Sequence, residues 1–240
     1  MSSLLPSPRV AIVRNYQTQD AWGQQMLDSI ADLAHKSIPH ASIHHFQPIE
    51  GGDLPSVADF DLIILTGGTL DLSEVEILPW AKEMIEWLHR EVPAHPNTKW
   101  LGFCWGHQVL ARAFGGTIVF RHDGALIGVE SIGLLKPGRD FFGGSQLLLH
   151  KFHKRVIGKP PEGFTQLAER WEIMRSDSNQ ILSFQAHPEL DEKISRGILD
   201  SDETYRASVG EEATKDLERL VALEHDGADT FHRVMKWALC

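Results

Sequence analysis

The feature that most constrains the fold is a regular alternation in the first half of the chain, where apolar runs of strand length are separated by longer stretches with helical periodicity. The strand-like runs cover residues 10–13, 43–46, 61–65 and 100–103, and the helical stretches cover residues 21–34, 79–88 and 109–114. This order is typical of a parallel sheet covered by crossover helices. The sequence therefore predicts an α/β fold.

The second half has shorter strand-like runs, at residues 125–135, 146–152, 164–170 and 181–185, and we expect them to extend the sheet with antiparallel members. From residue 190 the periodicity is helical again, and it predicts one buried face formed by Leu217, Leu220, Val221 and Leu223. We therefore expect a single domain over residues 1–240, with a core over about 9–190 and a C-terminal helical extension over about 190–240.

Charge and composition exclude several classes of protein. Lys and Arg total 23 against 33 for Asp and Glu, a formal net charge of −10, and neither sign forms a long block, which disfavours nucleic acids and anionic membranes as partners. No run approaches the roughly 18 apolar residues of a membrane helix, and residues 1–9 contain no apolar stretch of secretory length. The chain has 2 cysteines, too few for a disulfide scaffold. We expect a cytoplasmic protein.

Cys104 is the candidate nucleophile. It follows the strand-like run 100–103, precedes a helical stretch, and is flanked by Gly102 and Gly106. A strand-to-helix turn of this kind exposes its central side chain and needs flanking glycines so that the strand and the helix can approach closely. The N-terminus of a helix also favours a thiolate over a thiol. The alternative, a small buried apolar residue, leaves the glycine spacing unexplained.

Two backbone N–H groups are candidates for an oxyanion hole. One belongs to Trp105, directly after the cysteine, and the other to Gly68, in the loop 66–69 that follows the run 61–65. Paired amide donors of this kind stabilise the negative charge that develops on a carbonyl oxygen under attack.

His187 and Glu189 are the candidate partners of the cysteine. The sequence contains 13 histidines, so chance candidates are abundant, but Phe184-Gln-Ala-His-Pro-Glu189 directly follows an apolar strand. In extended chain the residues on either side of Pro188 project in the same direction. A thiolate usually has a histidine within hydrogen-bond reach, held by a further acceptor. We predict His187 as the base and Glu189 as its orienting carboxylate. Taken alone, the segment also fits a surface turn.

Two other histidine pairs, His44 with His45 and His150 with His153, raise the question of a metal site. No cluster of cysteines or carboxylates at ligand spacing accompanies either pair. We therefore expect neither a metal nor a cofactor.

The segments Gly102-Phe-Cys-Trp-Gly-His-Gln108 and Phe184-Gln-Ala-His-Pro-Glu189 together resemble the class I glutamine amidotransferases, especially the amidotransferase domain of GMP synthase and its stand-alone relatives. The resemblance extends to Thr66-Gly-Gly68, which is similar to the oxyanion loop of that family, and to Leu78-Pro-Trp80, which is similar to the opening of its next helix. It implies a flavodoxin-like, three-layer α/β domain with a mainly parallel central sheet, a few antiparallel strands in the second half, and C-terminal helices.

The resemblance also implies a reaction. Cys104 would attack the side-chain carbonyl of a γ-glutamyl amide, His187 would accept and return the proton, and Glu189 would orient His187. A γ-glutamyl thioester would form and be cleaved by water. Gly67 and Gln108 would bind the substrate, although a plain helix-surface glutamine is the alternative for Gln108.

One segment departs from the family pattern. Residues 150–156 lie where the GMP synthase relatives carry an element of the His-Gly-Asp type, and basic residues replace the acidic one here.

Several functions stay open. The chain is expected to act on a small molecule, either as a glutaminase that delivers ammonia to a separate acceptor enzyme or as a stand-alone γ-glutamyl peptidase acting on glutathione-like peptides or conjugates. A noncatalytic regulatory or binding protein on the same fold is a third hypothesis. A protein similar to DJ-1 and PfpI is a fourth, which the His-Pro-Glu segment fits less well.

Overall fold

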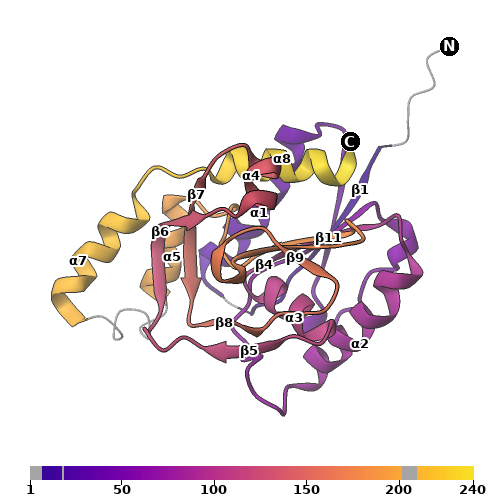
Figure 1. Cartoon of the computed structure of the whole chain (residues 1–240), viewed down its shortest axis with the longest axis horizontal. Helices are drawn as coiled ribbons and strands as arrows, with labels where there is room; N and C mark the ends of the chain where they lie inside the picture. Colours follow the sequence, from indigo (N-terminus) through magenta and orange to yellow (C-terminus); the bar gives the residue numbers. More distant parts are fainter. Residues whose placement is uncertain (1–6, 18, 202–209) are drawn as a thin grey trace.

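The four apolar runs of the first half form neighbouring parallel strands. They are β1 (Arg9–Val13), β2 (Ser42–Phe46), β3 (Leu62–Leu65) and β4 (Lys99–Phe103), and they lie in the order β2-β1-β3-β4. The computed structural model describes residues 7–17, 19–201 and 210–240 of the chain. Figure 1 shows the whole chain. The parallel registers of β1 with β3 and of β3 with β4 place the carboxyl ends of these three strands along one edge of the sheet.

Three strands of the second half complete a seven-stranded sheet. β11 (Ile181–Phe184) pairs with β4, and β10 (Ile173–Ser176) and β9 (Phe164–Gln166) follow as antiparallel members. The sequence predicted the run 181–185 as antiparallel, but β11 runs parallel to β4 because the turn after β10 reverses the chain before the strand begins. The predicted run 164–170 is shorter in the structure, where β9 ends at Gln166 and a 3-10 turn covers Glu169–Trp171.

Four further strands stand apart from the central sheet. β6 (Leu126–Gly133) pairs with β7 (Gln146–His153), and β5 (Thr117–Phe120) pairs with β8 (Arg155–Lys159), both antiparallel. The runs 125–135 and 146–152 were expected to extend the central sheet, and that expectation is wrong because they pair with each other instead. β7 still contacts the segment that follows β11, where His150 O accepts the N–H of His187 at 2.8 Å.

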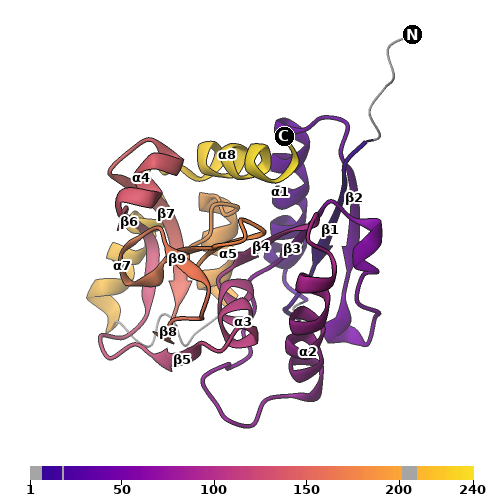
Figure 2. The same ribbon diagram turned by 45° about the vertical axis from the view of Figure 1, so that its right-hand side comes forward.

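The helices cover both faces of the sheet (Figure 2). α1 (Ala21–Ser37) and α8 (Gly227–Leu239) pack on the face to which Val10 and Ile12 point, whereas α2 (Pro79–Ala94) and α3 (Trp105–Ala113) cover the face of Ala11 and Val13. This alternation of β1 between two apolar cores gives the three layers that the resemblance implied. The expectation of a mainly parallel α/β sheet with antiparallel strands in its second half and helices at the C-terminal end is confirmed.

The remaining helices lie beside the small sheets and the first face. They are α4 (Lys136–Phe142), α5 (Glu192–Ser201) and α7 (Gly210–Val221). Leu217 and Val221 of α7 are buried as predicted, but Leu223 lies beyond the end of that helix and is 40% exposed. α2 continues to Ala94, past the predicted end at residue 88, because Val92 packs into the core. No helix within the described residues is long and apolar enough to cross a membrane.

Two histidines buried in the fold predict a loss of stability in acid. Burial lowers the pKa of His107 and of His150 to about 3, and their Nδ1 atoms lie 2.9 Å from the hydroxyls of Ser183 and Ser195 respectively. Because these folded-state values lie below the unfolded value of about 6.5, the stabilisation is present above pH 6.5 and lost as the pH falls toward 3, at up to about 1.4 kcal/mol per pH unit for each group.

The glutamine of a His107→Gln variant does not titrate. Between pH 7 and about pH 4.5, we expect the free energy of unfolding of this variant to fall by about 2–3 kcal/mol less than that of wild type. Urea unfolding at the two pH values measures this difference. His122→Gln, at an exposed position, is the control and should behave as wild type. Equal losses in the His107 variant and in wild type would show that His107 does not couple folding to protonation.

Candidate active site

Cys104 lies on the turn that joins β4 to α3. Its backbone has a φ of 47° and a ψ of −98°, a conformation that residues other than glycine rarely adopt. Its N–H donates to Phe184 O at 2.8 Å, and its carbonyl accepts the N–H of Gln108 at 3.0 Å. The turn is thus fixed to β11 on one side and to the first turn of α3 on the other. The predicted strand-to-helix turn is present.

Two glycines allow this turn to sit so close to the sheet. A Cβ on Gly106 would collide with the carbonyl oxygen of Leu65, and a Cβ on Gly102 would lie 2.7 Å from Gly106 O. β3, β4 and α3 therefore touch through backbone atoms. This close approach explains the glycine spacing around the cysteine.

The Gly106→Ala substitution is expected to destabilise the protein by about 1–3 kcal/mol and to lower Tm by several degrees, because the added methyl group forces β3 and α3 apart. Thermal unfolding followed by circular dichroism measures the change. Gly144→Ala is a matched control, since its Cβ would meet only Gln146 O, at an ordinary 3.5 Å. A Tm for Gly106→Ala as high as that of the control would contradict the close packing.

His187 and Glu189 meet in the buried space beside Cys104. His187 Nδ1 lies 2.7 Å from Glu189 Oε1, and both side chains are almost fully buried. The backbone of His187 is held by His150 O, and the Ser29 hydroxyl donates to Glu189 O at 2.6 Å. The two residues on either side of Pro188 thus converge as the sequence predicted, and the surface-turn alternative is wrong.

The charges around His187 favour its protonated form. Burial alone would lower the pKa of His187, but the charges of Glu189 and Cys104 and the side-chain hydrogen bonds to both of them raise it to about 10. The imidazole is therefore placed between a carboxylate and a sulfur atom that each stabilise an imidazolium ion.

The loop 66–68 lies directly over this pair. A Cβ on Gly67 would lie 2.9 Å from His187 Cε1 and 3.8 Å from Cys104 Cβ, so no side chain fits there. The loop is fastened to the end of β1, because the Thr66 hydroxyl accepts the N–H of Asn15 at 3.0 Å and the Asn15 amide donates to Thr66 O at 3.1 Å. The loop backbone is thereby brought close to the sulfur.

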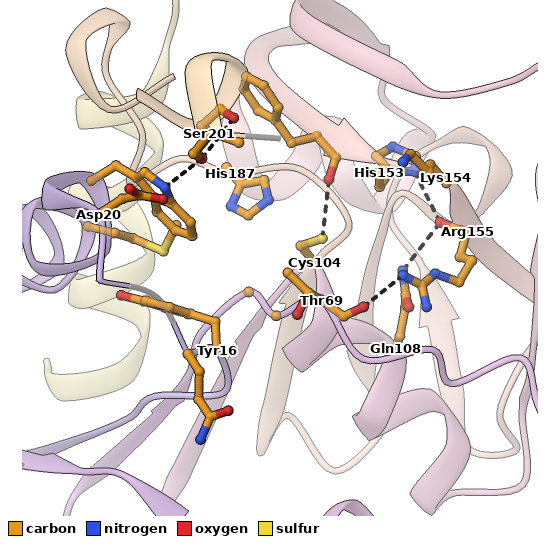
Figure 3. A pocket seen from close by; sticks show the side chains of 17 residues that line it. Tyr16, Asp20, Thr69, Cys104, Gln108, His153, Lys154, Arg155, His187 and Ser201 are labelled. Carbon is orange, nitrogen blue, oxygen red and sulfur yellow. Dashed lines mark hydrogen bonds between the residues drawn. The ribbon is translucent and has the colours of Figure 1, made fainter. Parts of the chain in front are cut away.

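A pocket of about 420 Å³ opens over Cys104 and His187 (Figure 3). This is the size of an ordinary small-molecule site. Its walls come from the end of β1, the first turns of α1, the loop 66–69, the end of β7 and α5. The lining residues are Tyr16, Gln17, Asp20, Trp22, Met26, Gly67, Gly68, Thr69, Cys104, Gln108, Phe152, His153, Lys154, Arg155, His187, Ile198 and Ser201.

Gln108 faces this pocket from α3. Only 3% of it is exposed, and its amide donates to Arg155 O at 3.2 Å and to Gln185 Oε1 at 3.1 Å. Arg155 in turn donates to Thr69 O at 3.1 Å, so it connects β8 to the loop over the cysteine. The alternative of a helix-surface glutamine is wrong.

Sequence reasoning missed one side of the pocket, formed by Tyr16, Trp22, Met26 and Ile198. A signal was present for Tyr16. Residues that directly follow a parallel strand lie at the carboxyl edge of the sheet, where α/β folds bind ligands. Tyr16 stands in such a place after β1. Met26 and Ile198 carry no comparable signal, because apolar helix residues ordinarily belong to a core.

Across the described chain, no group of three or more His, Cys, Asp or Glu side chains gathers in a way that would hold a metal ion.

Comparison with known proteins assigns the family. The sequence model of the class I glutamine amidotransferases matches residues 28–198, more than half of the chain. The chain belongs to this family. The resemblance inferred from the two motifs is confirmed, and class I glutamine amidotransferases generally hydrolyse glutamine or γ-glutamyl amides.

Some relatives match this chain over almost its whole length, and others match it over a part. Glutamine amidotransferase-like protein chry6 of Gibberella zeae is 35% identical over 233 residues, covering 97% of this chain and 96% of the relative. Gamma-glutamyl peptidase 5 of Arabidopsis thaliana is 36% identical over 113 residues, 42% and 44% of the two chains. A glutamine-hydrolyzing GMP synthase subunit of Saccharolobus solfataricus is 33% identical over 144 residues, 58% and 72% of the two chains.

The fold is also that of solved family members. The crystal structure of a glutamine amidotransferase from Thermotoga maritima superposes with a TM-score of 0.72, covering 98% of this chain and 100% of the other at 17% identity. At this low identity the likeness concerns the fold alone. The flavodoxin-like three-layer arrangement implied by the sequence is therefore the arrangement of this family.

Proposed function

We propose that this protein hydrolyses a γ-glutamyl amide through a covalent thioester on Cys104. The observation that carries the proposal is the side-chain arrangement in the pocket, which Cys104 and His187 both line and where His187 Nδ1 lies 2.7 Å from Glu189 Oε1. A sulfur nucleophile, an imidazole and an orienting carboxylate are the three parts that thiol acyl transfer needs.

The steps follow from the roles of these groups. Cys104 Sγ, as a thiolate, attacks the amide carbon, and the N–H groups of Gly68 and Trp105 stabilise the negative charge on the carbonyl oxygen. His187 gives its proton to the leaving nitrogen as the carbon–nitrogen bond breaks. Water then attacks the thioester, His187 takes a proton from that water, and glutamate leaves as the thiolate returns. Glu189 holds the imidazole in place throughout.

The remaining predicted site residues would hold the substrate. Gly67 leaves space next to His187 because it has no side chain, and Gln108 lines the pocket beside Arg155. Hydrogen-bonding groups at this end suit the amino and carboxylate groups of a glutamyl substrate.

The first candidate substrate is glutamine, with the ammonia passed to a separate acceptor enzyme. The similarity to the GMP synthase chain of Saccharolobus solfataricus, which is named as one subunit of that enzyme, supports this candidate. The second candidate is hydrolysis of a larger γ-glutamyl compound by the chain alone. The similarity to a gamma-glutamyl peptidase of Arabidopsis thaliana favours it.

The proposal is tested by measuring glutamate release from glutamine, glutathione and a γ-glutamyl amide. The Cys240→Ser protein is used, because it leaves Cys104 as the single thiol of the chain. We expect release from at least one of the three compounds, and we expect iodoacetamide to abolish it in proportion to alkylation of Cys104. Glutamate release that survives complete alkylation would reject the thiol mechanism. Absence of release from every compound would reject γ-glutamyl hydrolysis.

A further inference from the structure

The loop that carries the proposed oxyanion donor Gly68 is fastened on the side where the chain enters it. Thr66 is bonded to Asn15 at the end of β1. A Cβ on Gly68 would collide with Asn15 O and lie 3.0 Å from Trp105 Cγ, so the loop backbone packs directly on both residues. Beyond Gly68 the chain continues through residues 69–78 to α2. The contacts on this exit side therefore decide how firmly the Gly68 amide is placed.

Arg155 holds the exit side of the loop. It is the first residue of β8, and one nitrogen of its guanidinium donates to Thr69 O at 3.1 Å, while another lies 3.1 Å from Asp71 Oδ1. Dashed lines in Figure 3 join Arg155 to Thr69 and to Gln108. A guanidinium presents its donors as a rigid planar fork, so two contacts two residues apart fix both the position and the orientation of a segment. We call these two contacts the Arg155 clamp.

Asp71 is prepared for this contact by its own loop. The N–H and the hydroxyl of Ser73 donate to Asp71 Oδ1 at 2.7 Å and 2.6 Å. Burial would raise the pKa of the Asp71 carboxyl, but the hydrogen bonds from Ser73 and the charge of Arg155 outweigh burial and lower this pKa. The side chains of Arg155 and Asp71 are 16% and 30% exposed, so the pair is partly shielded from solvent. The carboxylate is thus held in place and charged.

Arg155 is itself held by two neighbouring elements. In the register of β5 with β8 it lies opposite Phe120, and its Cζ lies 5.7 Å from the centre of that ring. Its carbonyl oxygen accepts the side-chain N–H of Gln108, which belongs to α3, the helix that begins directly after Cys104. The clamp therefore ties the exit side of the loop to the elements that surround the cysteine.

Direct binding of an anionic substrate group is the other role open to a pocket-lining arginine. The two contacts of the clamp already engage the guanidinium, and Asp71 balances its charge. Arg155 belongs to the segment 150–156, where basic residues take the place of an acidic one. For Arg155, the structure shows that the changed charge is matched within the protein. A positioning role therefore fits the contacts better than substrate binding does.

We propose that Arg155 is a positioning residue, which acts through Thr69 and Asp71 to hold the Gly68 N–H against the carbonyl oxygen of the substrate. The inference rests on the proposed function, which uses Gly68 as an oxyanion donor. Loss of one such donor lowers kcat by about 10²- to 10³-fold, and a misplacement of about 1 Å lowers the rate by about 10²-fold. The bonds that form and break remain those made by Cys104 and His187.

The first test is the kinetics of Arg155→Met on the γ-glutamyl compound that wild type hydrolyses. Methionine removes both contacts of the clamp and keeps the carbonyl group that binds Gln108. We expect kcat to fall by about 10- to 100-fold and KM to stay within about threefold of wild type, because the lost interaction acts in the transition state. A rise in KM with kcat unchanged would show that Arg155 binds the substrate directly and would overturn the positioning role.

Two further variants separate the clamp from general loosening of the loop. Arg112 donates to Leu72 O at 2.7 Å and to Glu74 O at 2.8 Å, so it holds the same loop farther from Gly68. Arg112→Met should keep kcat within about threefold of wild type. Arg155→Lys keeps the charge but not the fork, and its kcat should lie between those of wild type and Arg155→Met. An equal loss of kcat in Arg112→Met and Arg155→Met would overturn the clamp.

A double-mutant cycle tests whether Arg155 and Asp71 act as a unit. Asp71→Asn removes the charge that the guanidinium contacts and is expected to lower kcat by about 3- to 10-fold. In the Arg155→Met background the same substitution should lower kcat by less than about twofold, because its partner is already absent. Effects that multiply in full would show that the two side chains act independently, which contradicts the clamp.

The clamp can also be measured without a γ-glutamyl substrate, by two reagents for Cys104 in the Cys240→Ser protein. p-Nitrophenyl acetate acylates the sulfur through a tetrahedral oxyanion: the Sγ–carbon bond forms and p-nitrophenolate leaves. Iodoacetamide alkylates the sulfur with loss of iodide and forms no oxyanion. We expect Arg155→Met to slow acylation at least about tenfold and to leave alkylation within about twofold of the parent protein. Equal changes in the two rates would overturn the inference.

These two assays distinguish failure of the clamp from failure of the proposed function. Acylation that depends on Arg155, in a protein that releases glutamate from no γ-glutamyl compound, would uphold the clamp and reject γ-glutamyl hydrolysis. Hydrolysis that requires Cys104, with the same kcat in wild type and Arg155→Met, would uphold the thiol chemistry and reject the clamp. Thermal unfolding of each variant checks that the compared proteins are folded.

Discussion

Substitution of Cys104 by alanine is expected to lower kcat for γ-glutamyl amide hydrolysis by at least about 10⁴-fold, because no thioester can then form. The residue lies at a backbone φ of 47° on a turn where Gly106 touches Leu65 of β3. The measurement is single-turnover release of glutamate from the preferred substrate, with the fold of the variant checked by circular dichroism.

Cys240→Ala is the control for this prediction. Cys240 is exposed, and with Cys104 it accounts for the thiols of the chain. This variant should retain the activity of wild type. Turnover by Cys104→Ala within tenfold of the wild-type rate would remove the thiol from the mechanism.

Substitution of Glu189 by glutamine is expected to lower kcat/KM on the order of 10³-fold and to change its pH dependence. Burial acts to lower the pKa of His187, and the carboxylate is the first of the groups that raise it to about 10. In wild type the imidazolium therefore persists until the pH rises through about 10. Without the charge of Glu189, the effect of burial dominates and the pKa of His187 falls. When the pH is raised, the variant is therefore expected to lose activity at a lower pH than wild type does.

The rate of Cys104 alkylation by iodoacetamide as a function of pH gives a second readout of the same pair. Glu189→Asp keeps the charge and is expected to keep the high-pH limit of wild type, at a reduced kcat because the shorter side chain misplaces the imidazole. A Glu189→Gln variant whose upper pH limit matches wild type would show that the carboxylate does not govern the protonation of His187.

The parts of the site that are local in sequence could be predicted from the sequence. The turn at Cys104 follows from an apolar run, two glycines and a helix, all within a few residues. The convergence of His187 and Glu189 follows from extended backbone on either side of a proline. Both segments also end strands of an α/β sheet, and parallel strands present their carboxyl ends at one edge. The proximity of the two segments was therefore predictable, although each is far from the other in the chain.

What could not be predicted depends on pairing between distant segments. The parallel direction of β11 depends on the turn after β10, and the separation of β6 and β7 from the central sheet depends on their preference for each other. The local apolar pattern does not indicate the direction of a strand or the strand with which it pairs. Ile198 shows the same limit at the site, because only the packing of α5 beside α1 places it in the pocket.

The most direct measurement is the intact mass of the protein during turnover. We expect rapid acid quenching of a reaction with saturating γ-glutamyl substrate to trap a species heavier than the free protein by one γ-glutamyl group. Peptide mapping should place that group on Cys104. A protein that turns over substrate with no such adduct, or with the adduct on another residue, would contradict the thioester mechanism.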